Sequence, residues 1–229
     1  AQLAGEHGDD AARDAAFGGH PDLVEPFARV IVHAAGFHDA EDAFDVFAPE
    51  GLFAGERIDA AIGKRGGHDA EVAAGHGATV LRLPFNLGIG GAVQTGFRYA
   101  WEHGCELVVR VDGDGQHDPA ELGAILAPVL AGHADVVIGS RFVGTDGYRS
   151  SRTRRVGIRV LAGTVSALVG RRVTDPTSGF QALNRHALAL FAADYPHDYP
   201  EVEATVMAHR CGLRMQEVPV TMRERGGGR

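Results

Sequence analysis

The 229-residue sequence has few cysteines, a single lysine and no long apolar run. Its two cysteines, Cys105 and Cys211, are far apart and lack metal-ligand spacing, which excludes a disulfide framework or a zinc motif. No apolar stretch reaches the roughly 18 to 20 residues that a membrane-spanning helix requires. No signal peptide with a basic start and an apolar centre is visible. We therefore expect a reducing, cytoplasmic setting, and a chain that is a fragment at both ends.

Acidic residues exceed basic ones, and the formal net charge of −8 argues against a nucleic-acid-binding protein. The acidity belongs to the first third. Residues 1–75 carry 15 acidic and 5 basic side chains, whereas residues 76–229 carry 15 and 17. Arginine supplies every basic side chain except Lys64. We attribute this bias to GC-rich coding rather than to function.

Hydrophobic periodicity predicts an α/β domain from residue 77 onward, with short strands alternating with helices. The predicted strands are mostly apolar, as in a sheet covered on both faces. A last strand over residues 213–220 ends in a proline-containing run that suits a sheet edge or a strand terminus. The other expected strands are 78–83, 106–111 and 135–138, and the expected helices are 91–102, 119–131, 155–169, 185–192 and 202–210.

Residues 1–76 form an atypical amino-terminal segment, distinct from the core at 77–229. The segment is rich in alanine, glycine, histidine and aspartate, and its apolar stretches are short. We expect helical pieces around residues 21–35 and 40–47.

The most informative segment is an apolar strand that runs into the sequence Val-Asp-Gly-Asp-Gly-Gln-His-Asp-Pro at residues 111–119. Asp112 and Asp114 are spaced i, i+2, so in extended backbone their carboxylates project to one side. Mg²⁺ and Mn²⁺ take one or two protein carboxylates and fill their other positions with water and substrate phosphates. The alternative is an acidic turn that caps a helix at Pro119, with Asp118 as the cap. A bare Asp-x-Asp pair favours that alternative, but the whole run favours the metal.

The run resembles the Asp-x-Asp region of family 2 glycosyltransferases, in particular the branch that acts on polyprenyl phosphates. Upstream, residues 83–92 are similar to the family's Asn-x-Gly loop. Downstream, residues 139–142 are similar to its Gly-Ser-Arg turn and residues 175–180 to its Asp-x-Thr-Ser-Gly-Phe element. Residues 199–201 and 217–220 complete the family's order, so the resemblance covers residues 77–229.

The resemblance implies a GT-A-like nucleotide-diphospho-sugar transferase sheet flanked by helices, with an incomplete or atypical amino-terminal portion. It implies metal-dependent, inverting transfer of a hexose from a GDP- or UDP-linked donor to a polyprenyl phosphate. The implied metal ligands for Mg²⁺ or Mn²⁺ are Asp112 and Asp114. The implied catalytic residues are Asp112, Asp114, Arg141, Asp175 and Glu201, and the implied donor-binding residues are Asn86, Gly88, Gly90, Gly91, Asp112 and Gln116.

Two motifs of the family are missing. Its members start with a buried strand leading to Pro-x-Tyr-Asn-Glu, and about 40 residues later have an Asp-Asp-Gly-Ser turn that reads the base. Counting back from residue 70, the second motif should fall at residues 62–65, where the sequence is Ile-Gly-Lys-Arg. The first third is thus a divergent half, a degenerate copy or, as we favour, a product of a shifted reading frame. A non-catalytic copy and a sugar nucleotidyltransferase remain alternative functions.

The acceptor decides which further groups the reaction needs. An alcohol needs a general base, for which Asp175, Glu201 and Glu203 are candidates. A lipid phosphate is largely ionised at neutral pH and needs none. Residues 149–172 contain seven arginines and no acidic residue, which suits a peripheral contact with anionic lipid at the inner face of the membrane. A solvated helix face is the alternative.

Overall fold

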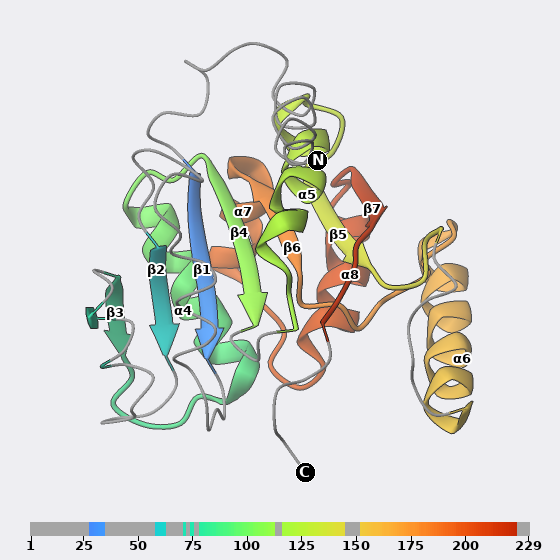
Figure 1. Cartoon of the computed structure of the whole chain (residues 1–229), viewed down its shortest axis with the longest axis horizontal. Helices are drawn as coiled ribbons and strands as arrows, with labels where there is room; N and C mark the ends of the chain where they lie inside the picture. Colours follow the sequence, from blue (N-terminus) through green and yellow to red (C-terminus); the bar gives the residue numbers. More distant parts are fainter. Residues whose placement is uncertain are drawn as a thin grey trace, which may run out of the picture.

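The computed structural model describes residues 28–34, 58–62, 71, 74–75, 78–112, 116–144 and 152–223. These residues form a mixed sheet flanked by helices (Figure 1). The strands are β1 Ala28–Ala34, β2 Ile58–Ile62, β3 Thr79–Arg82, β4 Leu107–Asp112, β5 Val136–Ser140, β6 Gln181–Asn184 and β7 Met215–Pro219.

The five helices expected from residue 77 onward are all present, each within a few residues of its predicted bounds. The stretch predicted at 119–131 is divided into a 3₁₀ turn and an α-helix. Within the described ranges, no helix combines the length and the apolar character needed to cross a membrane. The helical elements are α4 Gly88–Glu102, η2 Pro119–Glu121, α5 Leu122–Leu130, α6 Arg152–Val169, α7 Arg185–Ala193 and α8 Pro200–Arg210.

The strand order in the sheet is β3-β2-β1-β4-β6-β5-β7, and every strand runs parallel to the others except β6. The carboxyl ends of the parallel strands therefore share one edge, which is the lower edge in Figure 1. Open α/β sheets usually bind ligands at this edge. β7 is one of the two outermost strands of the sheet, as its proline predicted.

Three strands differ from the sequence-based expectation, and one of them is β2, since no strand or helix was predicted at residues 58–62. The helix predicted around residues 21–35 is wrong for Ala28–Ala34, which forms β1 between β2 and β4. The segment contains Val-Ile-Val, and β-branched residues favour strands when neighbouring strands are available for pairing. β6 was not predicted, because Gln-Ala-Leu-Asn has neither alternation nor β-branched residues. The helix predicted around residues 40–47 lies outside the described residues.

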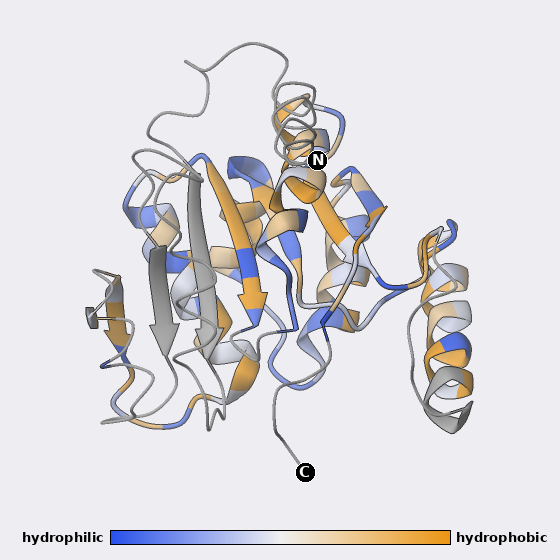
Figure 2. Ribbon diagram, in the orientation of Figure 1, coloured by the Kyte–Doolittle hydropathy of each residue, from blue (hydrophilic) through white to orange (hydrophobic). Residues whose placement is uncertain are grey.

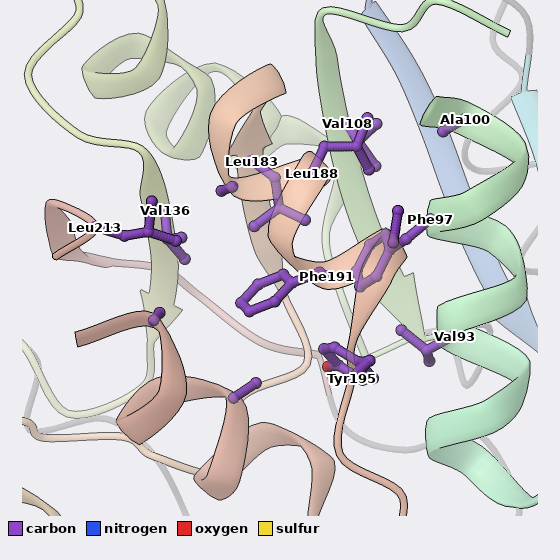
Figure 3. Close-up of a cluster of buried hydrophobic side chains, with 14 of the residues drawn as sticks. Val93, Phe97, Ala100, Val108, Val136, Leu183, Leu188, Phe191, Tyr195 and Leu213 are labelled. Atoms are coloured by element: carbon purple, nitrogen blue, oxygen red, sulfur yellow. The ribbon is translucent and has the colours of Figure 1, made fainter. Parts of the chain in front are cut away.

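Apolar side chains pack against both faces of β4. Val109 and Val111 join the cluster that includes Ile125 of α5, whereas Val108 joins the cluster on the opposite face. That second cluster contains Phe97 of α4 and Phe191 of α7 (Figure 3). Successive side chains of a strand point to opposite faces, so one apolar strand supports both layers. β4 is thereby fixed centrally, with its carboxyl end at the ligand-binding edge.

An ion pair between the buried Asp135 and the exposed Arg214 lies at the opposite end of the strands. Asp135, just before β5, accepts hydrogen bonds from Arg214 at 2.7 Å and from the side-chain amide of Asn184 at 2.8 Å. The hydrogen bond from Arg214 is the main reason why the pKa of Asp135 lies below its usual value, against the opposing effect of burial. This contact ties together the ends of β5, β6 and β7.

We predict that Phe97→Ala lowers the free energy of unfolding by about 3–5 kcal/mol. Phe97 is fully buried, and its ring centroid lies 5.8 Å from that of Phe191 and 5.3 Å from that of Tyr195. The loss should appear as a lower midpoint in urea unfolding. Leu130→Ala, at a half-exposed position on α5, is the control and should change stability by less than about 1 kcal/mol. A comparable loss in both variants would contradict this account of the core.

Candidate active site

The candidate site is built at the carboxyl ends of β4 and β5. Asp112 is the last residue of β4, and its side chain is 34% exposed. Its carboxylate lies directly against Gly179. A Cβ atom added at Gly179 would be only 2.9 Å from Oδ1 of Asp112. The Ser-Gly-Phe element therefore needs glycine there to leave room for the carboxylate.

His117 contacts the end of β4. Its Nδ1 accepts a hydrogen bond of 2.9 Å from the Asp112 backbone amide, and its ring stacks on Phe180 at a centroid distance of 4.7 Å. His117 is buried, with 4% of its surface exposed. These contacts give His117 a structural role at the start of the acidic run.

Gln116 and Asp118 contact Arg223, beyond β7. The carbonyl of Gln116 accepts a hydrogen bond from the Arg223 amide at 2.9 Å. Asp118 caps η2 by accepting from the amide of Ala120, as predicted, and also pairs with the Arg223 guanidinium at 3.0 Å. Asp114 lies outside the described residues, so its metal role stays a prediction.

Arg110 links Asp112 to α8, a contact that the sequence did not reveal. Its guanidinium donates to Glu201 at 2.6 Å, to Asp112 at 3.4 Å and to the hydroxyl of Tyr195 at 3.1 Å. Of the predicted site residues, the structure thus brings Asp112 and Glu201 together around one cation. An arginine in an otherwise apolar strand, two residues before Asp112, was the available signal.

Arg141 and Asp175 form a second charged pair. Arg141 donates from Nε to Oδ2 of Asp175 at 2.7 Å and from Nη2 to Oδ1 at 2.6 Å. Its backbone amide also donates to Asp175, and Nη2 reaches the hydroxyl of Thr177 at 2.8 Å. Asp175 is completely buried, and this bidentate geometry fixes the loop that leads to Gly179. A catalytic role for Arg141 remains a prediction.

Glu217 of β7 secures the same loop from below, and sequence reasoning had given it no role. Its carboxylate accepts hydrogen bonds from the backbone amides of Thr174 and Asp175 at 2.8–2.9 Å. The hydroxyl of Thr174 lies 2.7 Å from that of Ser140 at the end of β5. In the sequence, the only signal for Glu217 was its place in residues 217–220, which resemble the last motif of the family.

Local geometry explains the asparagine and the glycines of the predicted donor-binding loop. Asn86 Oδ1 accepts a hydrogen bond from the amide of Gly88, which has a φ of 73°, a conformation that favours glycine. A Cβ atom at Gly90 would collide with the Pro196 carbonyl and lie 2.6 Å from the Cα of His197. Gly91 is similarly close to Leu87. The loop therefore packs on the segment next to Tyr195, and donor binding by these residues remains a prediction.

Comparison with known proteins gives consistent results. The sequence model described as glycosyl transferase family 2 matches residues 68–191, more than half of the chain. The chain is 36% identical over 150 residues to the polyprenol monophosphomannose synthase of Mycolicibacterium smegmatis, covering 64% of this chain and 56% of that protein. It is 34% identical over 151 residues to the undecaprenyl-phosphate mannosyltransferase of Micrococcus luteus, covering 64% and 61%.

A third relative is the UDP-N-acetylglucosamine–dolichyl-phosphate N-acetylglucosaminyltransferase of Methanococcus voltae, 32% identical over 138 residues that cover 59% of this chain and 55% of that protein. The chain thus spans between about half and two thirds of the length of these relatives.

Among solved structures, glucosyl-3-phosphoglycerate synthase from Mycobacterium tuberculosis matches with a TM-score of 0.68 and 18% identity. The match covers 99% of this chain and 78% of that one, and that protein was crystallised with Mn²⁺, uridine diphosphate and phosphoglyceric acid. At this identity the likeness concerns the fold, and it confirms the expected GT-A architecture. Sequence match, sheet order and the acidic run at the end of β4 agree, and the chain belongs to glycosyl transferase family 2.

Proposed function

We propose that this protein transfers a hexose, with inversion, from a GDP- or UDP-linked donor to a polyprenyl phosphate. The named activities of three relatives support this acceptor class, since each name includes a polyprenol or a polyprenyl-type phosphate. The observation that carries the proposal is that two of the candidate bases are paired with arginines. Asp175 is buried in a bidentate pair with Arg141, and Glu201 accepts a 2.6 Å hydrogen bond from Arg110.

Asp175 is completely buried, and Glu201 is oriented toward Arg110 by its short hydrogen bond, so neither carboxylate is placed to take a proton from an acceptor hydroxyl. The third candidate, Glu203, accepts a hydrogen bond from the Tyr199 amide at the start of α8. An alcohol acceptor would need a base near its oxygen. A phosphate monoester, with a second pKa of about 6, is already nucleophilic at neutral pH. The pairing of Asp175 and Glu201 therefore favours the anionic acceptor.

Asp112 and Asp114 would hold the metal ion, Mg²⁺ or Mn²⁺. The donor set fits, because a partly exposed carboxylate at a strand end is the kind of ligand that these ions combine with phosphate oxygens. When bound, the ion would supply positive charge for the departing nucleoside diphosphate.

The exposed side chains of helix α6 support the proposal that the protein makes a peripheral contact with the cytoplasmic face of the membrane. The helix packs on α8 through Val165 and Val169. Away from this contact, Val156, Val160 and Leu168 are 58–65% exposed. They are spaced by four and eight residues, so they lie on one side of the helix. Figure 1 places α6 at the periphery of the molecule, and Figure 2 shows apolar and polar residues interspersed along it. The exposed arginines nearby are Arg159, Arg171 and Arg172.

Transfer of a radiolabelled sugar tests the proposal. We expect labelled lipid from GDP-mannose or UDP-linked sugars with undecaprenyl phosphate and Mn²⁺, and at least a hundredfold less with the uncharged alcohol undecaprenol. Asp112→Asn should lower the rate by about 100-fold or more, since a charged ligand for the metal is lost. Glu106→Gln, at an exposed position, is the matched control. No transfer from any donor would favour a non-catalytic copy, and sugar-dependent release of pyrophosphate from a nucleoside triphosphate would favour a nucleotidyltransferase.

The contact between Gly179 and Asp112 makes a second prediction. Gly179→Ala should weaken Mn²⁺-dependent binding of uridine or guanosine diphosphate by about 5- to 100-fold, because the added methyl group displaces the Asp112 carboxylate at a cost of about 1–3 kcal/mol. Calorimetric titration measures the effect. Gly163→Ala on α6, where a methyl group meets nothing within 4 Å, is the control. Unchanged binding in Gly179→Ala would remove Asp112 from the nucleotide site.

The membrane contact is tested by sedimentation with vesicles. Val160→Ser combined with Leu168→Ser should weaken attachment to anionic vesicles, because each apolar side chain contributes about 1.5–3 kcal/mol when it leaves water. Attachment should also fall as salt rises, since screening shortens to about 8 Å at physiological ionic strength. Leu130→Ser, at a half-exposed position on α5, is the control. Equal sedimentation with neutral and anionic vesicles would exclude the charge-driven contact.

A further inference from the structure

Arg110 is an arginine inside the central strand of the sheet. It is 1% exposed and is among the largest fully buried side chains of the described chain. The sequence of β4, Leu-Val-Val-Arg-Val-Asp, is otherwise apolar up to its last residue, and Figure 2 shows this hydrophilic interruption near the strand's end. Side chains two residues apart on a strand share a face, so Arg110 and Asp112 both face the layer that contains Tyr195. An unpaired charge in such a place would be costly.

The contacts of Arg110 are unequal. The hydrogen bond to Glu201 is short, at 2.6 Å, whereas the contact with Asp112 is 3.4 Å long. Nε of Arg110 is buried and has no hydrogen-bond partner. Burial opposes the charged form, but Tyr195, Asp112 and Glu201 together outweigh it and raise the pKa of Arg110. The guanidinium is therefore a permanent cation, firmly bound to Glu201 and more loosely to Asp112.

This arrangement affects how a metal ion meets Asp112. The side chains of Asp112 and Glu201 are 34% and 22% exposed, so both carboxylates reach solvent from either side of one buried cation. Together with Arg110 they leave a single net negative charge. A divalent cation that approaches alone must compete with Arg110 for Asp112 and is repelled by the guanidinium. A cation that arrives with a diphosphate brings compensating negative charge.

We propose that Arg110 is a positioning residue that makes metal binding depend on the nucleoside diphosphate. Arg110 keeps its contact with the Asp112 carboxylate when the cation approaches alone. It releases the carboxylate when the cation arrives bound to the diphosphate. The firm bond to Glu201 keeps the guanidinium in place during the exchange. The inference rests on the proposed function in taking Asp112 as a metal ligand.

Binding of Mn²⁺ alone, followed by the electron paramagnetic resonance signal of the free ion, tests the proposal. The unmodified chain should bind Mn²⁺ weakly, and Arg110→Met should bind it about tenfold more tightly, because the competing cation is gone. Arg110→Lys should stay within about twofold of the unmodified chain, since it keeps the charge. Glu201→Gln should bind Mn²⁺ more weakly, because Asp112 then becomes the sole carboxylate partner of Arg110. The matched control is Arg214→Met, which removes an arginine from the ion pair at the opposite end of the strands.

The same variants are then titrated with uridine and guanosine diphosphate in the presence of Mn²⁺. The dependence of metal affinity on the diphosphate should shrink in Arg110→Met and persist in Arg214→Met. Equal or weaker binding of Mn²⁺ alone by folded Arg110→Met would overturn the proposal. If Arg110→Met fails to fold, as judged by circular dichroism, stronger binding of Mn²⁺ by Glu201→Gln would overturn it instead. A chain that binds neither nucleotide contradicts the proposed function, whereas the change in affinity for Mn²⁺ alone still decides the role of Arg110.

Discussion

The site depends on the need to pair charges that are buried at the end of an apolar sheet. Such groups are tolerated only with partners and hydrogen bonds. Arg141 satisfies Asp175 on the β5 side, and Arg110 satisfies Glu201 on the α8 side. The first pair fixes the loop that brings Gly179 against Asp112, and the second contacts Asp112 directly. One carboxylate is thus placed by two independent arginine pairs from opposite sides.

Much of the fold follows from the sequence because its long signals are strong. The helices have clear periodicity, and the apolar strands end at glycine, proline or charged residues. β6 is four residues long, and only its pairing with two neighbouring strands defines it. β1 shows the same limit in another form, since alanines flanking Val-Ile-Val fit a helix until parallel neighbours are present. Non-local pairing, which no window of sequence contains, decides both cases.

The site was predictable where chemistry and spacing coincide in one run, as at Asp112. It was not predictable where residues far apart in the chain meet. Arg110 and Glu201 are 91 residues apart, and Arg141 and Asp175 are 34 apart. Arg141 and Asp175 were each expected to be catalytic, yet the structure shows the two side chains in a bidentate pair with each other. Residue type indicated that an anion would be the partner, but only the fold could indicate which anion.

The antiparallel insertion of β6 has a consequence for how the chain acquires its structure during synthesis. Both neighbours of β6 precede it in the sequence, so β4 and β5 leave the ribosome with facing edges that nothing yet joins. Unpaired edges of apolar strands are prone to association with other chains. The gap closes only when Gln181–Asn184 has emerged, about 40 residues after the end of β5, which takes roughly 2 to 8 seconds at 5–20 residues per second. The facing edges of β4 and β5 are therefore open to association with other chains throughout that interval.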